Sequence, residues 1–275
     1  MSFLDDQFYG QVKRHLERSR GVDLTGYSPS FVMRAIKKRM GRSSSETPQG
    51  YAKLLMRSEE ETNELLNALS INVTEFFRDK GAFESLQVRV LRPLLDLKVK
   101  SGGGILRIWD AGCATGQETY TIAIGLAEEV NRIGAVGLPL MSIVGTDISR
   151  DALAKAKSAL YTPEEVDNVP DKYLSAYFVK RGGYYEVVEP LRRRVRFHLE
   201  NLLSAPSSKF FDAIVCRNVL IYFSRPMHET VMRNLYDSLR VNGFLMLGRT
   251  EALIGDMRRR FEVVDQENRI LLKIQ

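Results

Sequence analysis

The chain has 275 residues, of which 44% are hydrophobic and 27% are charged, as is usual for a globular protein. Lys and Arg outnumber Asp and Glu by 40 to 34, and the net charge of +6 favours acidic partners such as nucleic acid, an anionic membrane surface or an acidic protein. No apolar run approaches the roughly 20 residues of a membrane span. The first residues do not have the pattern of a signal peptide, so we expect a cytoplasmic protein without membrane insertion.

The cysteine and histidine content argues against disulfides and metals. Cys113 and Cys216 lie far apart in the sequence, and the chain is long enough to bury a core without disulfide bonds. His15, His198 and His228 show no metal-ligand spacing with one another or with the cysteines. We therefore predict no structural metal.

Residues 1–70 are predicted to be helical. Apolar residues recur at helical spacing around Phe8, Val12 and Leu16, and Ser28-Pro29 is typical of a helix start. The segment GRSSSETPQG (41–50) is a polar connection, and the helical pattern continues over 59–70. We predict a helical N-terminal domain over residues 1–75.

The rest of the chain alternates between strand and helix patterns. A glycine-rich break ends at Gly104, and the sheet is expected to begin near Ile105. Further strands are predicted around 141–149, 194–201, 210–218 and 243–250, helices over 117–132, 150–159 and 226–239, and a final antiparallel pair over 261–265 and 269–275. Alternation of this kind predicts a mostly parallel, doubly wound sheet covered by helices on both faces, here a domain over 76–275.

One segment interrupts the alternation. Residues 176–191 are aromatic and β-branched around Gly182-Gly183, which is typical of a short hairpin. We predict a small β-rich insertion at about 176–197.

A glycine loop is the sharpest local motif. Residues 110–116 read D-A-G-C-A-T-G and stand directly between an apolar strand and a helix, where open α/β sheets bind ligands. Asp147 ends the next strand, where a carboxylate can accept ribose hydroxyls. Ala114 occupies the place of the glycine that admits a pyrophosphate in dinucleotide enzymes, which favours S-adenosylmethionine over a dinucleotide. A tight strand-to-helix turn without a ligand is the alternative.

Four segments carry a resemblance to a known family. They are INVTEFFRD (71–79), GCATGQETYTIAIGLAEE (112–129), GTDIS (145–149) and FDAIVCRNVLIYF (211–223). Together they resemble the chemotaxis receptor methyltransferases (CheR), over nearly the whole chain. The resemblance implies a Rossmann-like domain that uses S-adenosyl-L-methionine and releases S-adenosyl-L-homocysteine. It also implies a protein-glutamate O-methyltransferase that methylates chemoreceptors and serves adaptation in chemotaxis.

The resemblance also implies a set of cofactor contacts. Asp147 is expected at the ribose, Asn201 near the adenine, and Arg78 and Glu118 at the charged methionine end. The full set of expected cofactor-binding residues is Asn72, Thr74, Arg78, Gly112, Glu118, Asp147, Asn201, Leu202, Arg217 and Asn218. The alternatives are a surface ion pair for Arg78, a helix-dipole role for Glu118, and turn-forming roles for Asn201 and Asn218.

The implied reaction needs no general base, because a glutamate carboxylate is ionised at neutral pH. The enzyme's task is then to orient the reacting groups, which is worth roughly 7–11 kcal/mol at best. Arg78 and Tyr222 are the predicted catalytic residues, which line the methyl-transfer site. A core position is the alternative for Tyr222.

Two surface features concern the receptor. In SFVMRAIKKRM (30–40), Arg34, Lys37 and Lys38 share one helix face, which the resemblance implies to dock the acidic methylation helices of chemoreceptors. A solvated helix face is the alternative. Some family members grip a tethering peptide at the receptor's C-terminus with a longer loop in the β-insertion. The tight Gly182-Gly183 turn predicts that this chain does not depend on such a peptide.

Departures from the family pattern keep two alternatives open. G-Q-E-T-Y (116–120) stands where the family usually has G-E-E-P-Y, and L-G-R-T-E (247–251) replaces L-G-H-S-E, so that Gln117, Thr119 and Arg249 differ. One alternative is a non-catalytic module that binds S-adenosylmethionine. The other is a nucleic-acid methyltransferase, although the [DNS]-P-P-[YFW] motif common in amino-directed enzymes of that class is replaced by C-R-N-V (216–219), and we expect no nucleic-acid partner.

Overall fold

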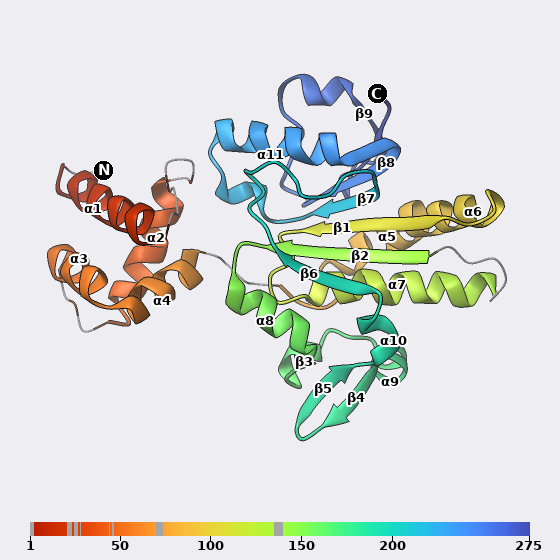
Figure 1. Cartoon of the computed structure of the whole chain (residues 1–275), viewed down its shortest axis with the longest axis horizontal. Coiled ribbons are helices and arrows are strands. Elements are labelled where there is room, and N and C mark those ends of the chain that lie inside the picture. The colour runs from red at the N-terminus through yellow and green to blue at the C-terminus, as the bar shows by residue number, and fades with distance from the viewer. Residues whose placement is uncertain are drawn as a thin grey trace. The chain divides into compact units, whose positions relative to one another are not determined.

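The chain forms two compact units. The computed structural model describes residues 3–20, 24, 27, 29–43, 45, 47–69, 74–134 and 140–275. One unit comprises Met1–Ile71 with Tyr222–His228, and the other comprises Asn72–Ile221 with Glu229–Gln275 (Figure 1). The sequence placed a boundary after residue 75, and no local pattern marked the short segment from the C-terminal half that joins the first unit. Within the described residues, no helix is long and apolar enough to cross a membrane.

The first unit is helical, as the sequence predicted. Its helices are α1 (Phe3–Arg20), α2 (Pro29–Met40), α3 (Pro48–Arg57) and α4 (Glu59–Leu69). Their apolar faces pack into one core that includes Val12, Leu16, Ile36 and Leu55, each 1% exposed or less. Tyr222 packs against this core, with its ring 4.8 Å from that of Phe31.

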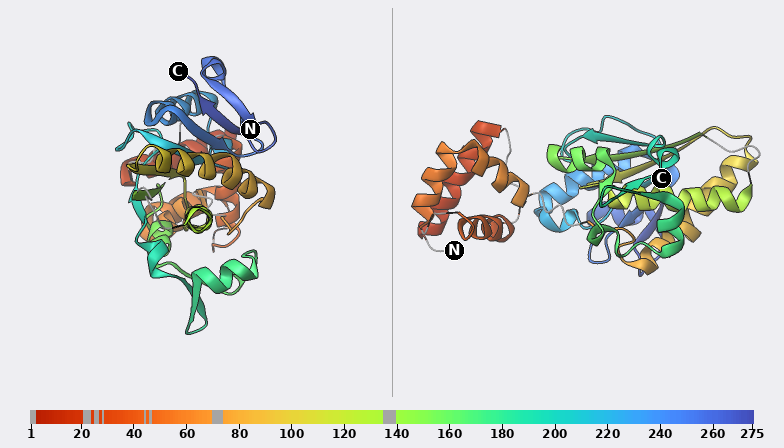
Figure 2. Two further views of the ribbon diagram at one scale, coloured as in Figure 1. Left: turned by 90° about the vertical axis from the view of Figure 1, so that its right-hand side faces the viewer. Right: turned by 90° about the horizontal axis from the view of Figure 1, so that it is seen from below.

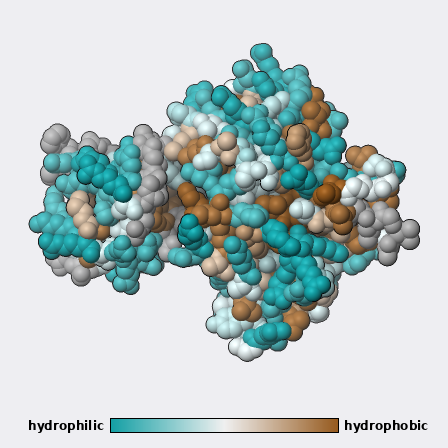
Figure 3. All heavy atoms as spheres, viewed as in Figure 1, coloured by the Kyte–Doolittle hydropathy of each residue, from teal (hydrophilic) through white to brown (hydrophobic). Residues whose placement is uncertain are grey.

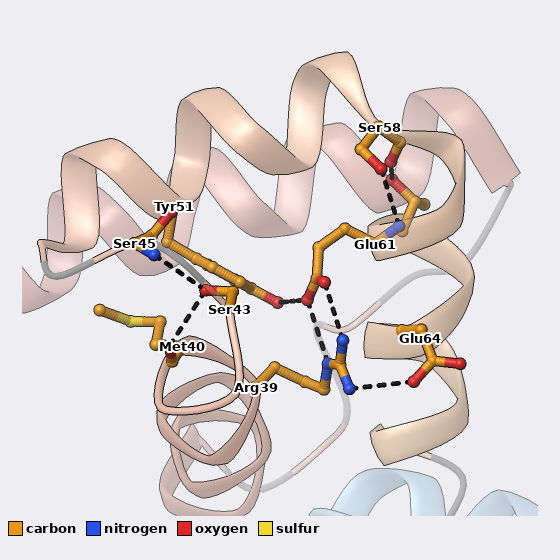
Figure 4. A network of polar contacts seen from close by, with 9 residues as sticks. Arg39, Met40, Ser43, Ser45, Tyr51, Ser58, Glu61 and Glu64 are labelled. Atoms are coloured by element: carbon orange, nitrogen blue, oxygen red, sulfur yellow. Dashed lines mark hydrogen bonds and ion pairs between the residues drawn. The ribbon is translucent and has the colours of Figure 1, made fainter.

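A polar network joins three of these helices inside the first unit (Figure 4). The Arg39 guanidinium of α2 donates to both carboxylate oxygens of Glu61 in α4, at 3.1 and 2.8 Å. The hydroxyl of Tyr51 in α3 donates to the same carboxylate at 2.8 Å. Burial alone would raise the pKa of Glu61, but these hydrogen bonds hold it below its ordinary 4.5. A buried charge is tolerated here because every one of its partners is in place.

The second unit is built on a seven-stranded sheet in the order β6-β2-β1-β7-β8-β10-β9. Its strands are β1 (Ile105–Ala111), β2 (Leu140–Asp147), β6 (Val195–Leu199), β7 (Phe211–Cys216), β8 (Leu239–Leu247), β9 (Phe261–Asp265) and β10 (Ile270–Lys273). The first five run parallel, and the predicted antiparallel pair at the end is confirmed. Strand β8 begins four residues earlier than Gly243, where its sequence pattern suggested a start, because Leu239 already pairs with Phe211.

The helices of this unit are arranged by the crossovers between strands. They are α5 (Lys80–Leu86), a π-helical turn (Gln87–Leu91), α6 (Arg92–Lys100), α7 (Gln117–Ile133), α8 (Arg150–Ser158), α11 (Arg225–Ser238) and the short 3-10 turns Leu220–Tyr222 and Gly255–Arg259. The π-helical turn precedes Pro93, which has no N–H to donate to the preceding turn. Crossovers of one hand put α7 and α8 on one face of the sheet and α11 on the other.

Helices lie on both faces of the sheet, as predicted, but the crossover from β6 to β7 carries none. The connection from β6 to β7, residues 200–210, forms turns only. Figures 1 and 2 show helices behind β6, β2 and β1, and none in front of these three strands. The alternation of strand and helix patterns did not predict this missing helix, because the two strands have the same sequence pattern whether or not a helix lies between them.

The predicted hairpin is confirmed and belongs to a small three-stranded sheet. Strands β4 (Phe178–Arg181) and β5 (Tyr184–Val187) pair antiparallel through the turn at Gly182-Gly183. The sheet order is β3-β5-β4, with β3 being Leu160–Tyr161. A 3-10 turn (Glu164–Val166) and the helices α9 (Asp171–Tyr177) and α10 (Glu189–Arg192) connect it to the large sheet.

Candidate active site

The glycine loop after β1 adopts left-handed backbone conformations. The φ angles are 88° at Gly112, 47° at Ala114 and 91° at Gly116. A Cβ at Gly112 would lie 2.5 Å from Cγ2 of Val219, in the loop after β7. Glycine is required there because both the positive φ and the close approach of the two loops exclude a side chain.

Asp147 holds this loop in place. One carboxylate oxygen accepts a hydrogen bond from the backbone N–H of Ala114 at 2.9 Å, and the other accepts from Ser149 at 2.8 Å. Burial raises the pKa of Asp147, and these backbone donors oppose that rise. Each carboxylate oxygen keeps a further lone pair, so the group can still accept a ligand hydroxyl.

A small hollow at the strand ends brings together charged side chains of both signs. Arg78, Glu118 and Arg217 are among the residues that line it. Arg217, which is 8% exposed, pairs with Glu118 at 2.6 Å and with Asp79 at 2.5 Å. Three of the predicted cofactor residues therefore meet in one place, although β7, α7 and the turn before α5 contribute them.

Asp110 adds a buried carboxylate that the sequence prediction did not include as a site residue. It is fully buried, and Thr119 donates to one of its oxygens at 2.5 Å, while the other oxygen has no hydrogen-bond partner among the described residues. Burial, followed by the charge of Glu118, raises the pKa of Asp110 well above its ordinary value. An unpartnered buried oxygen at a strand end is a feature that a bound polar group would satisfy.

Glu251 is a second residue that the sequence prediction missed. It is 3% exposed, and its carboxylate accepts from the backbone N–H groups of Asn218 at 3.0 Å, Leu220 at 2.7 Å and Gly248 at 2.6 Å. It thereby ties the loop after β7 to the loop after β8. The sequence gives little indication of this role, because the partners of Glu251 are backbone N–H groups, which residues of any type can provide.

The other predicted residues are placed as follows. Asn201 is exposed, and its side-chain oxygen accepts from the N–H of Leu203 at 3.0 Å, which is the turn-forming role considered as its alternative. Leu202 is buried beside it, Asn218 has a φ of 59°, and Thr74 is half-buried. Asn72 lies outside the described residues.

The remaining predictions fall in the helical unit. Tyr222 belongs to that unit rather than to the one that holds the glycine loop. Arg34, Lys37 and Lys38 are exposed on α2, on the side opposite its buried residues Val32 and Ile36.

The arrangement favours binding and orientation over nucleophilic catalysis. Cys113 and Cys216 are buried and free, and burial raises the pKa of both thiols, so neither is a ready nucleophile. In the part of the chain that the structure describes, no cluster of side chains could hold a metal ion. Cations and carboxylates side by side in a small hollow suit a zwitterionic group, such as the amino-acid end of a ligand.

Comparison with known proteins gives the family. Residues 72–270 match the family described as CheR methyltransferase, SAM binding domain, and residues 8–70 match its all-alpha domain. A chemotaxis protein methyltransferase of Listeria innocua is 30% identical over 90% of this chain and 90% of its own length. That of Escherichia coli K12 is 29% identical over 96% of this chain and 90% of its own length.

A third relative is longer. An uncharacterized 104.1 kDa protein of Rhodobacter capsulatus is 33% identical over 95% of this chain, which spans 27% of that protein. The chain belongs to the CheR methyltransferase family. It is a methyltransferase with a Rossmann-like fold whose cofactor is S-adenosylmethionine. The orphaned oxygen of Asp110 and the tight Gly112 turn are features of this structure that fit such a ligand.

Proposed function

We propose that the chain methylates glutamate side chains of chemoreceptors and so serves adaptation in chemotaxis. The hollow lined by Arg78, Glu118 and Arg217, beside the glycine loop, carries this proposal because its charges complement the ammonium and carboxylate of a methionine group. The relatives named as chemotaxis protein methyltransferases support it over most of the chain.

The cofactor assignments follow from position in the second unit. Arg78 and Glu118 bind the methionine end, with Arg217 holding Glu118 in place. Asp147 accepts the ribose hydroxyls, and Asn201 with Leu202 borders the adenine. Gly112 and Asn218 shape the loops that approach the ligand, and Asn72 and Thr74 complete the set.

The reaction asks little acid–base chemistry of the protein. When bound, S-adenosylmethionine supplies a sulfonium-linked methyl group that a carboxylate oxygen can displace, leaving a neutral thioether. Arg78 orients the acceptor carboxylate by a charge-assisted hydrogen bond. Tyr222 stays the second predicted catalytic residue, and Tyr222→Phe should lower turnover while cofactor affinity stays nearly unchanged.

The receptor is bound through α2 and without a tether. Arg34, Lys37 and Lys38 present an exposed basic face to the acidic methylation helices. The two-residue turn between β4 and β5, with both glycines at positive φ, has no longer loop with which to grip a receptor peptide. Binding of the isolated C-terminal receptor peptide would contradict independence from a tether.

A transfer assay tests the whole proposal. Receptor-enriched membranes are incubated with the chain and with S-adenosylmethionine labelled in its methyl group. We expect label on the receptor that mild base releases as methanol, which is the behaviour of a carboxyl ester. Receptors whose methylated glutamates are replaced by alanine should take up no label. Label in RNA or DNA, or binding of S-adenosylmethionine without transfer, would contradict the proposal.

A further inference from the structure

One face of the large sheet is bare where a helix usually lies. The connection from β6 to β7 must cross β2 and β1, because both lie between its ends in the sheet. Crossovers between parallel strands usually carry a helix that packs on the strands they pass. Residues 200–210 provide none. No helix of this connection therefore packs on β6, β2 and β1, although Trp109 and Thr146 at the centre of this face are each only 2% exposed.

The side chains of this open face follow from strand register. Arg107 lies opposite Ser142, Trp109 opposite Val144, and Val144 opposite Arg196. The open face consists of Ile105, Arg107 and Trp109 in β1, Leu140, Ser142, Val144 and Thr146 in β2, and Arg196 and His198 in β6. Figure 3 shows apolar residues gathered along the middle of this face between polar borders.

Large apolar side chains are unusually exposed here. Ile105 is 49% exposed and Leu140 is 72% exposed, side by side at the start of β1 and β2. Adjoining exposed apolar side chains of this kind mark interaction sites on folded proteins.

A hollow in the open face can hold an inserted side chain. Trp109, Val144 and Phe211 are its apolar lining residues. The rings of Trp109 and Phe211 lie 5.4 Å apart, and the Trp109 indole N–H donates to Thr146 at 2.9 Å. The indole N–H is thus paired. The side of the hollow beside Trp109 suits an apolar group, while Thr146, His198, Glu200, Ser207 and Ser208 form its polar side.

Two arginines on the face outnumber the one carboxylate that lines its hollow, Glu200, whose oxygens already accept hydrogen bonds from Ser207. Arg107 and Arg196 stand on the face, and neither pairs with a carboxylate among the described residues. Arg196 donates only to backbone carbonyls, and the Arg107 guanidinium lies over the Phe211 ring. A second copy of this chain would bring like charges together on the same apolar strip. The occupant that complements the face is therefore acidic.

We propose that the open face binds an acidic amphipathic helix of a partner protein. Three strands about 4.8 Å apart span a strip about 10 Å wide, which matches one helix. The helix sets apolar side chains on Ile105, Leu140 and the hollow beside Trp109, and carboxylates against Arg107 and Arg196. This interaction is separate from methyl transfer, and it holds whether or not receptors are the substrate.

Trp109 is the chain's one tryptophan, so its fluorescence reports on this face directly. The probe is a synthetic amphipathic helical peptide with leucines on one face and glutamates beside them. We expect saturable binding to the full chain, seen both as a change in tryptophan emission and as increased anisotropy of the labelled peptide. Leu140→Asp and Ile105→Asp should each weaken it roughly tenfold or more. Arg196→Glu should weaken it and reduce its dependence on salt.

Leu97→Asp is the matched control. Leu97 is 57% exposed on α6, which packs with α7 on the other face, so this variant should bind the peptide as the parent does. Thermal unfolding confirms that each variant is folded. The proposal is overturned if the peptide does not bind, if a peptide with lysines in place of the glutamates binds equally well, or if Leu97→Asp weakens binding as much as Leu140→Asp. Self-association of the chain that Leu140→Asp abolishes would instead identify a second copy as the occupant.

Discussion

Left-handed backbone conformations gather at the ends of the central strands. Gly112, Ala114 and Gly116 after β1 and Asn218 after β7 all have positive φ, as does Asp79 before α5. Glycine adopts this conformation readily, but it costs free energy at Ala114, Asn218 and Asp79, which carry side chains. Such conformations persist only where surrounding contacts fix them, and here Asp147, Glu251 and Arg217 supply those contacts. The protein's own contacts thus hold these loops in their strained conformations.

Gly112→Ala tests the close approach of two loops. The added Cβ meets Val219 at 2.5 Å, and alanine at positive φ costs about 1–2 kcal/mol more. We expect the affinity for S-adenosylhomocysteine, measured by titration calorimetry, to fall roughly tenfold or more.

Val219→Ala separates the two causes of that loss. It removes the clashing methyl group but not the strain in the backbone, so the double variant should recover part of the affinity and not all of it. Affinity in Gly112→Ala equal to that of the parent would show that the ligand does not depend on this turn.

Asp110 gives the folded chain a specific pH dependence. Unfolded, its carboxyl loses the proton near its ordinary pKa of 3.8, whereas burial and Glu118 raise the pKa in the folded state. Between these two values the folded state binds more protons, so the free energy of unfolding falls as the pH rises. We expect Asp110→Asn to flatten this dependence, as measured by urea unfolding at several pH values from about 4 upward.

Asp256→Asn serves as the comparison, because Asp256 is exposed. It should leave the slope of stability against pH as in the parent. The assignment fails if Asp110→Asn retains the parent slope. If Asp110→Asn also weakens binding of S-adenosylmethionine, the result supports a hydrogen bond between the ligand and the unpartnered oxygen of Asp110.

At the scale of elements, the helical unit depends on one carboxylate. Glu61 joins α2, α3 and α4 through Arg39 and Tyr51, and all three side chains are largely buried (Figure 4). Glu61→Gln removes the negative charge that pairs with Arg39. It also places an amide N–H₂ group, which cannot accept a hydrogen bond, against one of the donors Arg39 and Tyr51. We expect it to lower the free energy of unfolding by about 2–4 kcal/mol in urea.

Glu64→Gln is the matched control, since it removes the other carboxylate of Arg39. The Glu64 side chain is 47% exposed, so the loss should stay below about 1 kcal/mol. Equal effects of the two substitutions would show that burial of Glu61 contributes nothing special.

Local patterns predicted most elements because the spacing of apolar residues that marks a strand or a helix can be seen within a few neighbouring residues. The strands around Ile143 and Ile214 are short apolar runs, and the turn at Gly182-Gly183 marks its hairpin. The absence of a helix from a crossover is harder to predict. Residues 200–210 look like an ordinary connection, and only the strand order shows that this connection crosses two strands without a helix. The π-helical turn before Pro93 was likewise hidden inside one helical pattern.

At the scale of the whole molecule, the candidate site was predictable where it follows strand ends. Gly112, Asp147 and Arg217 end neighbouring strands, so their approach follows from a parallel sheet. Glu251 and the Asp110–Thr119 pair were missed, because their partners are backbone groups or lie around a turn. The roles given to Asn72, Asn201 and Tyr222 rest on family resemblance and stay predictions.

The chain has a net charge of +6, and the exposed basic face of α2 is the part of it that we expect to bind a partner. If Arg34 and Lys37 dock an acidic receptor region, then Arg34→Glu with Lys37→Glu should raise the Michaelis constant for receptor roughly tenfold, most strongly at low salt. The affinity for S-adenosylhomocysteine should not change, because these residues belong to the helical unit and the glycine loop to the other. Lys53→Glu with Arg57→Glu changes the total charge equally on the exposed side of α3. If that control pair raises the Michaelis constant as much, overall charge rather than the α2 face attracts the receptor.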